Sequence, residues 1–473
     1  MPPAPMHPAK ARKLTARSLA VLLSLLITGG SVLADDWPPT IDSNNPTTKS
    51  ADGRTIERYT HGPRESWEYP ASASGEWSYP PPQETGPKQQ NHNSFYVVTP
   101  KQPQPETPLC VVLHSANRTA YDYMGFDCLE RSLPERGDFH TVMTKSPQDF
   151  YALFLNSTNA EWWGWGQIRR QGDKTPGQVS PAERRVFDTI EWVVNHYHID
   201  RNRIYLCGVS MGGCGTLGLG IPHGDVFAAV KATVPAGTEY VAYRMGGFPP
   251  APADASAADR DAWTKRISAV GLPDPPVVVD FSAQNDNWSK TQPALLQAAQ
   301  AGRLPLVLSW GLFGHATFAN LVAKYAPCEV ALAFPWLEIR RNEAYPVFTH
   351  ASTDQRSPWL DAPAEFDESG QMNAWFRWKS TRDTPASFAM ELWLDHPKIT
   401  NPLTPPETAT ADLTLRRLQH FKVQPNAAYH WELSRASKPL ASGRITPDAA
   451  NLLTIPRASL ATEPTELSLT PER

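Results

Sequence analysis

Short apolar runs, each bounded by polar turn residues, recur along the middle of this 473-residue chain. They fall at residues 94–100, 109–113, 151–155, 204–207, 229–234, 277–279 and 306–308. Uninterrupted runs of this length are typical of parallel strands that are buried on both faces. Helical patterns lie between them, and one begins with a capping box in which Ser180 and Glu183 flank Pro181. Strands alternating with helices predict an α/β fold with a doubly wound, mostly parallel sheet over residues 91–340.

The alternation stops between residues 237 and 276, where glycine, proline and alanine dominate. An insertion at this point of such a sheet either covers a binding site as a cap or forms a surface excursion without function. The sequence leaves both interpretations open.

After about residue 340 the helical patterns disappear. Short apolar stretches separated by polar turns predict strands at residues 372–378, 388–394, 411–415 and 429–433. Strands without intervening helices favour a β-sandwich. Residues 341–473 are therefore predicted to form a C-terminal all-β domain.

The N-terminus has the pattern of a secretory signal. Basic residues precede an apolar run at residues 19–27, and small residues lead up to Ala34. The run is shorter than the ~20 residues that a membrane span needs. We expect a signal peptide over residues 1–34, a secreted or periplasmic protein, and no membrane association after cleavage. Residues 35–90 are polar and proline-rich, and predict an extended lead-in before regular structure begins at residue 94.

Composition narrows the possible partners. The net charge of −4 provides no basic surplus, which argues against nucleic acid as a partner. The five cysteines lack metal-binding spacing, so we expect no metal or other cofactor and at most one disulfide.

One segment carries a recognisable chemical motif. Gly208-Val209-Ser210-Met211-Gly212 follows a predicted buried strand and opens a helical pattern. A serine hydroxyl is a weak nucleophile that needs exposure, a base and donors for the developing oxyanion. A sharp strand-to-helix turn exposes it, and the glycines on either side keep side chains out of the bend. Ser210 is the predicted nucleophile, and the Met211 amide is a predicted oxyanion donor.

The acid and the base of such a site are expected later in the chain, each just beyond a strand. Asp286 lies on the loop after the run at residues 277–279, whereas Asp280 lies inside that strand. We therefore prefer Asp286 as the acid, with Asp280 as the alternative. His315 follows the run at residues 306–308 and is the predicted general base.

Two further features lie at the same edge of the predicted sheet. The loop after residues 109–113 offers the backbone amide of Ser115 or of Ala116 as the second oxyanion donor, and the sequence does not choose between them. Trp163 and Trp165 follow another strand, and Trp288 lies close to Asp286; these three are candidate substrate-binding residues. Packing within the loops is the competing interpretation.

The segment around Ser210 resembles that of feruloyl and acetylxylan esterases and of polyhydroxybutyrate depolymerases in the α/β-hydrolase superfamily. The resemblance rests on residues 200–213, on the continuation at residues 225–230, on the strand at residues 108–114 and on the Gly314-His315 step. It covers roughly residues 90–335. It implies a serine esterase with an α/β-hydrolase fold, in which Ser210, Asp286 and His315 form the triad. The implied substrate is a polysaccharide-linked feruloyl or acetyl ester, or a polyester.

Two positions bear on this resemblance. The family commonly has His-Gly where this chain has His114-Ser115, and Met211 replaces the arginine that glucuronoyl esterases carry, which argues against that group. The alternatives are a serine peptidase of the prolyl-oligopeptidase type, which shares the motif and the order of the triad, and a binding protein on a hydrolase scaffold.

Overall fold

The computed structural model describes residues 39–42, 47–50, 53–62, 94–116, 118–128, 149–157, 181–235, 274–315, 325–358 and 368–472. They belong to one compact unit, Pro39–Arg473. The predicted signal peptide, Trp163, Trp165 and most of the insertion at residues 237–276 lie outside the described residues.

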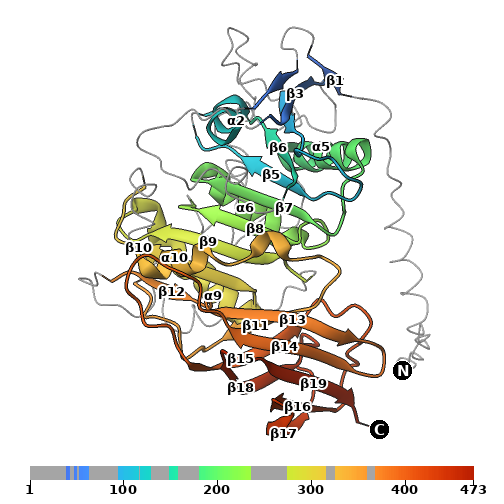
Figure 1. Cartoon of the computed structure of the whole chain (residues 1–473), viewed down its shortest axis with the longest axis vertical. Helices are drawn as coiled ribbons and strands as arrows, with labels where there is room; N and C mark the ends of the chain where they lie inside the picture. Colours follow the sequence, from blue (N-terminus) through green and yellow to red (C-terminus); the bar gives the residue numbers. More distant parts are fainter. Residues whose placement is uncertain are drawn as a thin grey trace, which may run out of the picture. The chain divides into compact units, whose positions relative to one another are not determined.

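Eleven of the described strands form one large sheet (Figure 1). Their order is β1-β3-β4-β6-β5-β7-β8-β9-β10-β12, and β2 pairs with β3. The bounds are β1 Thr40–Ile41, β2 Thr48–Lys49, β3 Thr55–Thr60, β4 Ser94–Val98, β5 Leu109–Leu113, β6 Tyr151–Leu155, β7 Ile204–Val209, β8 Ala229–Thr233, β9 Val277–Ala283, β10 Leu306–Gly311 and β12 Gly370–Met372. From β6 to β10 all neighbours are parallel, whereas β4 and β12 run antiparallel to β6 and β10.

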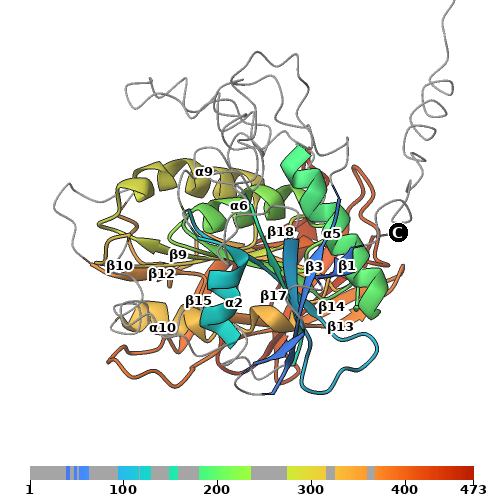
Figure 2. The same cartoon turned by 90° about the horizontal axis from the view of Figure 1, so that it is seen from above.

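Helices cover both faces of this sheet. They are α2 Ala120–Cys128, α5 Pro181–Tyr197, α6 Met211–Gly220, α9 Gln292–Gly302 and α10 Ala326–Leu332. In Figure 2, α5, α6 and α9 lie on one face, and α2 and α10 lie on the other. Burial on both faces explains why strands such as β5 consist of apolar residues alone.

Three strands of the large sheet, β1, β2 and β3, precede residue 94 and were not predicted. The longest, β3, is mostly polar and has no apolar run. Ile56 and Tyr59 are buried, whereas Glu57 and Arg58 are partly exposed. Pairing with β4 on one side and with β1 and β2 on the other gives this strand its hydrogen-bonding partners. Regular structure therefore begins before residue 94.

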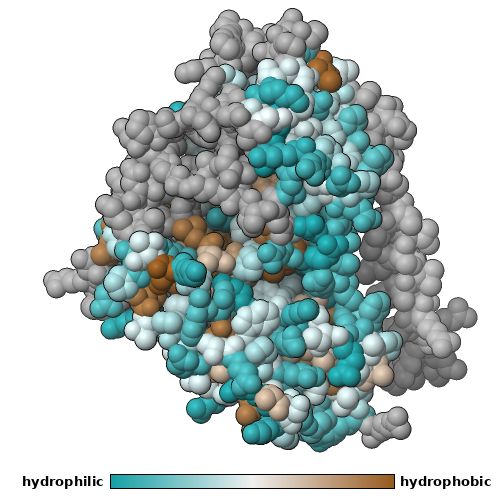
Figure 3. All heavy atoms as spheres, in the orientation of Figure 1, coloured by the Kyte–Doolittle hydropathy of each residue, from teal (hydrophilic) through white to brown (hydrophobic). Residues whose placement is uncertain are grey.

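The C-terminal part contains two antiparallel sheets, drawn in orange and red in Figure 1. One sheet has the order β11-β15-β18, with β11 Tyr345–Thr349, β15 Thr408–Arg416 and β18 Thr454–Ala461. The other has the order β13-β14-β19-β16-β17, with β13 Phe376–Asp383, β14 Phe388–Leu394, β19 Thr465–Pro471, β16 Tyr429–Arg435 and β17 Lys438–Ile445. On the face in Figure 3, hydrophilic residues cover most of this part. The predicted fold class, a doubly wound α/β-hydrolase sheet followed by an all-β part, is confirmed.

The strand predicted over residues 372–378 is wrong in detail. Asn373 has a φ of 61° and ends β12, which joins the large sheet beside β10. A second strand, β13, then begins at Phe376 in a different sheet. The apolar pattern does not reveal the turn, because Ala374, Trp375 and Phe376, which follow it directly, are all buried.

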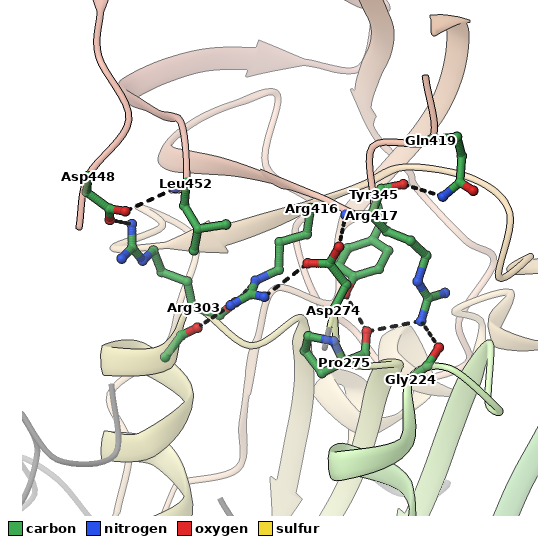
Figure 4. A network of polar contacts seen from close by, with 11 residues as sticks. Gly224, Asp274, Pro275, Arg303, Tyr345, Arg416, Arg417, Gln419, Asp448 and Leu452 are labelled. Carbon is green, nitrogen blue, oxygen red and sulfur yellow. Dashed lines mark hydrogen bonds and ion pairs between the residues drawn. The ribbon is translucent and has the colours of Figure 1, made fainter. Parts of the chain in front are cut away.

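A polar junction joins the C-terminal sheets to the large sheet (Figure 4). The Arg416 guanidinium lies 3.1 Å from an Asp274 carboxylate oxygen, and the other oxygen of that carboxylate accepts from the Arg417 backbone N–H at 2.9 Å. The buried Arg417 side chain donates to the Pro275 carbonyl at 3.1 Å and lies over the Tyr345 ring. Tyr345 in turn donates to the same carbonyl.

No helix among the described residues is long and apolar enough to cross a membrane. Four of the five cysteines have described side chains, Cys110, Cys207, Cys214 and Cys328, and all four are buried thiols.

Candidate active site

The turn between β7 and α6 holds Ser210 in a backbone conformation that is unusual for a residue with a side chain, with φ 59° and ψ −117°. Its N–H donates to the Thr233 carbonyl of β8 at 3.0 Å, which fixes the turn to the sheet. The neighbouring chain leaves no room for side chains, since a Cβ at Gly208 would lie 2.4 Å from the Gly212 carbonyl oxygen. A Cβ at Gly212 would lie 2.1 Å from the Leu113 carbonyl oxygen. The two glycines therefore allow β5, β7 and α6 to converge beneath the hydroxyl.

A continuous line of hydrogen bonds runs from this hydroxyl. Ser210 Oγ lies 2.7 Å from Nε2 of His315, and Nδ1 of the same ring lies 2.5 Å from Oδ2 of Asp286. The carboxylate is buried, and the imidazole is partly exposed. His315 follows β10 and Asp286 follows β9, and parallel strands bring these carboxyl ends to one edge of the sheet. The arrangement allows the histidine to take a proton from the serine while the aspartate orients the ring.

The Asp286 carboxylate is itself fixed by its surroundings. It caps the short 3₁₀ helix η5, Asn287–Thr291, and its Oδ1 accepts from the Trp288 backbone N–H at 2.9 Å. The Ser289 hydroxyl donates to the Asp286 carbonyl at 2.7 Å. One carboxylate oxygen is thus held by the loop while the other faces His315.

Asp280, the alternative acid, has different surroundings. It is fully buried within β9, where Gln292 donates to its carboxylate at 2.9 Å and Ser282 donates at 3.3 Å. Burial raises the pKa of this carboxyl to about 7, against the effect of both hydrogen bonds. The structure brings Asp286 to His315 and leaves Asp280 bonded to these two side chains.

The predicted oxyanion donors belong to two segments that pack against each other, the first turn of α6 and the loop after β5. Met211 is the first residue of α6, and the backbone N–H groups in the first turn of a helix have no acceptor within the helix. The end of β5 packs against this turn, with the carbonyl oxygens of Leu113 and His114 nearest to Gly212. In the loop that follows, Ser115 is buried and Ala116 is exposed. The loop that carries Ser115 and Ala116 therefore follows directly from the strand end that packs against the nucleophile turn.

Two polar residues at the end of β6 were not predicted to belong to the site. Asn156 and Ser157 are buried, and the Ser157 backbone N–H donates to Nε2 of His114 at 3.0 Å. The available signal was a pair of short polar residues directly after a fully apolar strand, at the edge where the other site residues gather.

Of the three candidate substrate-binding tryptophans, the described one is Trp288. It lies in η5, two residues after Asp286, and 40% of its surface is exposed. An exposed indole at this place offers a flat apolar surface to a ligand. Among the described side chains, no group of three or more histidine, cysteine, aspartate or glutamate residues is arranged to hold a metal ion.

Comparisons with known proteins add little. No protein-family model matches the chain, and no curated protein matches it. Among solved structures, a thermostable esterase is 19% identical over 52% of this chain and 59% of its own length, with a TM-score of 0.32. S-formylglutathione hydrolase FrmB from Staphylococcus aureus is 12% identical over 52% of this chain and 92% of its own length, with a TM-score of 0.31. A ferulic acid esterase is 14% identical over 51% of this chain and 92% of its own length, also with a TM-score of 0.31. TM-scores this low support no inference about this chain, which spans less than two-thirds of the thermostable esterase.

Proposed function

We propose that this protein is a serine hydrolase that cleaves carboxylic esters, with Ser210 as nucleophile, His315 as general base and Asp286 as the residue that orients it. One observation carries the proposal: the line from the Ser210 hydroxyl through both nitrogens of His315 to the Asp286 carboxylate, with separations of 2.7 and 2.5 Å. Few structural roles require a serine at a positive φ, a histidine and a buried carboxylate in this order.

The reaction follows from these contacts. Ser210 Oγ forms a bond to the ester carbonyl carbon, its proton passes to Nε2 of His315, and the carbonyl electron pair moves to the oxygen. The Met211 amide, together with that of Ser115 or Ala116, donates to this oxyanion. When the bond to the alcohol breaks, the proton on Nε2 passes to the departing oxygen. Water then attacks the acyl-enzyme by the same route and releases the acid.

The substrate class is part of the proposal. The sequence around Ser210 resembles enzymes for feruloyl, acetyl and polyester substrates, and Trp288, Trp163 and Trp165 are proposed to contact the substrate. The predicted signal peptide supports a secreted or periplasmic location, where the enzyme would encounter a polymeric or small ester substrate. We expect no nucleic acid partner and no cofactor.

The first test compares two serine variants. Wild-type protein is expected to hydrolyse p-nitrophenyl acetate and to react with a fluorophosphonate probe. Ser210→Ala should lower kcat by about 10⁴–10⁶-fold and lose labelling, whereas Ser459→Ala, at an exposed serine of the C-terminal part, should behave as wild type. Unchanged activity in Ser210→Ala would disprove the nucleophile assignment, and absent labelling of wild type would favour the non-catalytic alternative.

A substrate panel tests the finer proposal. It contains methyl ferulate, acetylated xylan, a polyester film and a peptide p-nitroanilide. Hydrolysis of one or more of the esters without the anilide supports the esterase. Cleavage of the anilide alone would favour the peptidase alternative.

A further inference from the structure

His114 lies fully buried at the carboxyl end of β5, between the loops that follow β5 and β6. Its Nε2 faces the Ser157 backbone N–H at 3.0 Å, and its Nδ1 faces the Ser115 carbonyl oxygen at 2.9 Å. A backbone N–H can only donate and a carbonyl can only accept, so Nε2 is the acceptor and Nδ1 carries the hydrogen. The two contacts therefore define one neutral tautomer.

The neutral form suits the surroundings of the ring. Burial lowers the pKa of His114 to about 4, so the ring is uncharged near neutral pH. A proton on Nε2 would oppose the Ser157 N–H and break that hydrogen bond. His114 can thus serve as a fixed bridge, whereas His315, which is partly exposed and bonded to a carboxylate, is placed to move protons.

The partner loop is held rigidly. Asn156 Oδ1 accepts from the Ala120 backbone N–H at 2.7 Å, and its Nδ2 donates to the Ser94 carbonyl at 3.1 Å. The Asn156 carbonyl accepts from the Arg185 guanidinium at 2.9 Å. Since Ser157 follows directly, its N–H has a fixed direction, and so does the ring that accepts from it.

The orientation of the ring determines the direction of the next peptide group. The Ser115 carbonyl accepts from His114 Nδ1–H and from the Arg118 N–H at 3.2 Å. In a trans peptide the carbonyl and the following N–H point in opposite directions, so the Ala116 N–H points away from the buried ring. The His114 carbonyl lies near Gly212, and the Ser115 N–H opposite to it is directed away from the first turn of α6.

We propose that His114 is a positioning residue that holds the Ser115 carbonyl inward and thereby presents the Ala116 amide as the second oxyanion donor. Ala116 is exposed and Ser115 is buried. Among the described residues, no acceptor is found for the Ala116 N–H or for the Ser115 N–H, so direction and exposure distinguish the two amides. The proposal rests on the proposed function, since an oxyanion donor has a role only if Ser210 attacks a carbonyl.

Two conservative variants separate the two bonds of His114. In His114→Asn the side-chain amide nitrogen takes the place of Nδ1 and keeps the donor to Ser115. In His114→Gln the amide oxygen takes the place of Nε2 and keeps the acceptor for Ser157. His114→Phe removes both. The measurements are kcat and KM for p-nitrophenyl acetate, Ki for a trifluoromethyl ketone that forms a hemiketal with Ser210, and the melting temperature.

Loss of one oxyanion donor lowers kcat by about 10²–10³-fold, and misdirection of one should cost part of this. We expect His114→Gln and His114→Phe to lower kcat at least about tenfold with little change in KM. The Ki for the trifluoromethyl ketone should rise by a similar factor. His114→Asn should recover most of the loss. If His114→Gln recovers activity and His114→Asn does not, the Ser157 bond is the important one and the proposal is overturned, as it is if His114→Phe matches wild type.

A second variant keeps the test decisive if the His114 variants fold poorly. Ala116→Pro removes the proposed donor itself, and should weaken ketone binding by about 10²-fold or more while the melting temperature stays near that of wild type. Wild-type affinity in this variant would exclude Ala116 as the donor. Fluorophosphonate labelling of the wild-type protein distinguishes failure of the proposed function from failure of the His114 proposal. Without labelling the proposed function fails, whereas with labelling only the role of His114 is in question.

Discussion

Asp280 and Asp286 are six residues apart and differ in what surrounds each carboxylate. Asp286 lies beyond the end of β9. One of its carboxylate oxygens accepts a hydrogen bond from the Trp288 backbone N–H, and the other is hydrogen-bonded to His315. Asp280 lies inside the strand and is bonded to Gln292. At the scale of single residues, the surroundings of a carboxylate decide what it can do, and each of the two makes a different prediction.

Asp286→Asn should separate catalysis from stability. The asparagine oxygen can still accept from the Trp288 N–H, but its amide would face Nδ1 of His315 as a donor and impose the wrong tautomer. We expect kcat for p-nitrophenyl acetate to fall by about 10³–10⁴-fold with the melting temperature almost unchanged. Asp286→Ala, which also loses the cap, should lower both; an active Asp286→Asn enzyme would contradict the assignment.

Asp280 should make stability depend on pH. The unfolded carboxyl has a pKa of 3.8 and the folded one a pKa of about 7, so between these values the unfolded chain binds fewer protons and a rise in pH favours unfolding. Asp280→Asn should reduce this slope by up to about 1.4 kcal/mol per pH unit. Urea unfolding at several pH values measures it. Asp354, whose pKa burial also raises to about 7, keeps its own contribution, and identical slopes in both proteins would refute the prediction.

At the scale of the elements, β5, β7 and α6 pack so closely at Gly208 and Gly212 that these two positions have no room for a side chain. Parallel pairing brings Leu113 level with Gly208, and the first turn of α6 then packs against the end of β5. This contact links the nucleophile turn to the loop that carries Ser115 and Ala116. A distortion of the nucleophile turn should therefore also displace the loop that carries Ser115 and Ala116.

Gly212→Ala tests this contact. Its Cβ would lie 2.1 Å from the Leu113 carbonyl oxygen, and backbone on both sides must move. We expect the free energy of unfolding to fall by at least about 2 kcal/mol and kcat to fall more than tenfold. Gly62→Ala is the control, because nothing lies within 4 Å of its added Cβ. Equal behaviour of the two variants would show that the convergence is not tight.

For the described molecule as a whole, the C-terminal sheets are bound to the α/β sheet by buried polar groups. Arg417 donates to the carbonyl oxygens of Gly224, Phe227 and Pro275, which lie in the segments that precede β8 and β9. Figure 4 shows the contacts with Gly224 and Pro275. Strand β12 adds a covalent and hydrogen-bonded link to the same sheet. Such connections favour unfolding of both parts in a single transition.

Arg417→Met should destabilise both parts together. The arginine is buried and its carbonyl partners would lose their donors, so we expect a loss of about 2–4 kcal/mol. Arg444→Met removes an arginine that is 69% exposed and pairs with Glu472, and should cost less than about 0.5 kcal/mol. Calorimetry of both variants measures the effect. Two separate transitions in wild type, or a shift confined to one of two transitions, would contradict the coupling.

Much of this protein follows from sequence alone, because the signals are local. Apolar runs identified β5 through β10, since strands buried on both faces have few polar positions. The glycines around Ser210 predicted a sharp turn, because only that turn requires them. Parallel strands place their carboxyl ends at one edge, so Asp286 and His315 were expected near Ser210 before any distance was known.

Tertiary structure decided what depends on contacts between distant segments. Strand β3 has a mostly polar sequence without an apolar run and is defined by its pairing with β4, β1 and β2. The turn at Asn373 lies within an apolar stretch, and its place is set by the two sheets that the chain connects. The direction of the Ala116 amide depends on His114 and, through it, on Ser157. Hydrogen bonds and packing across the fold fix these features, and no local pattern in the chain encodes them.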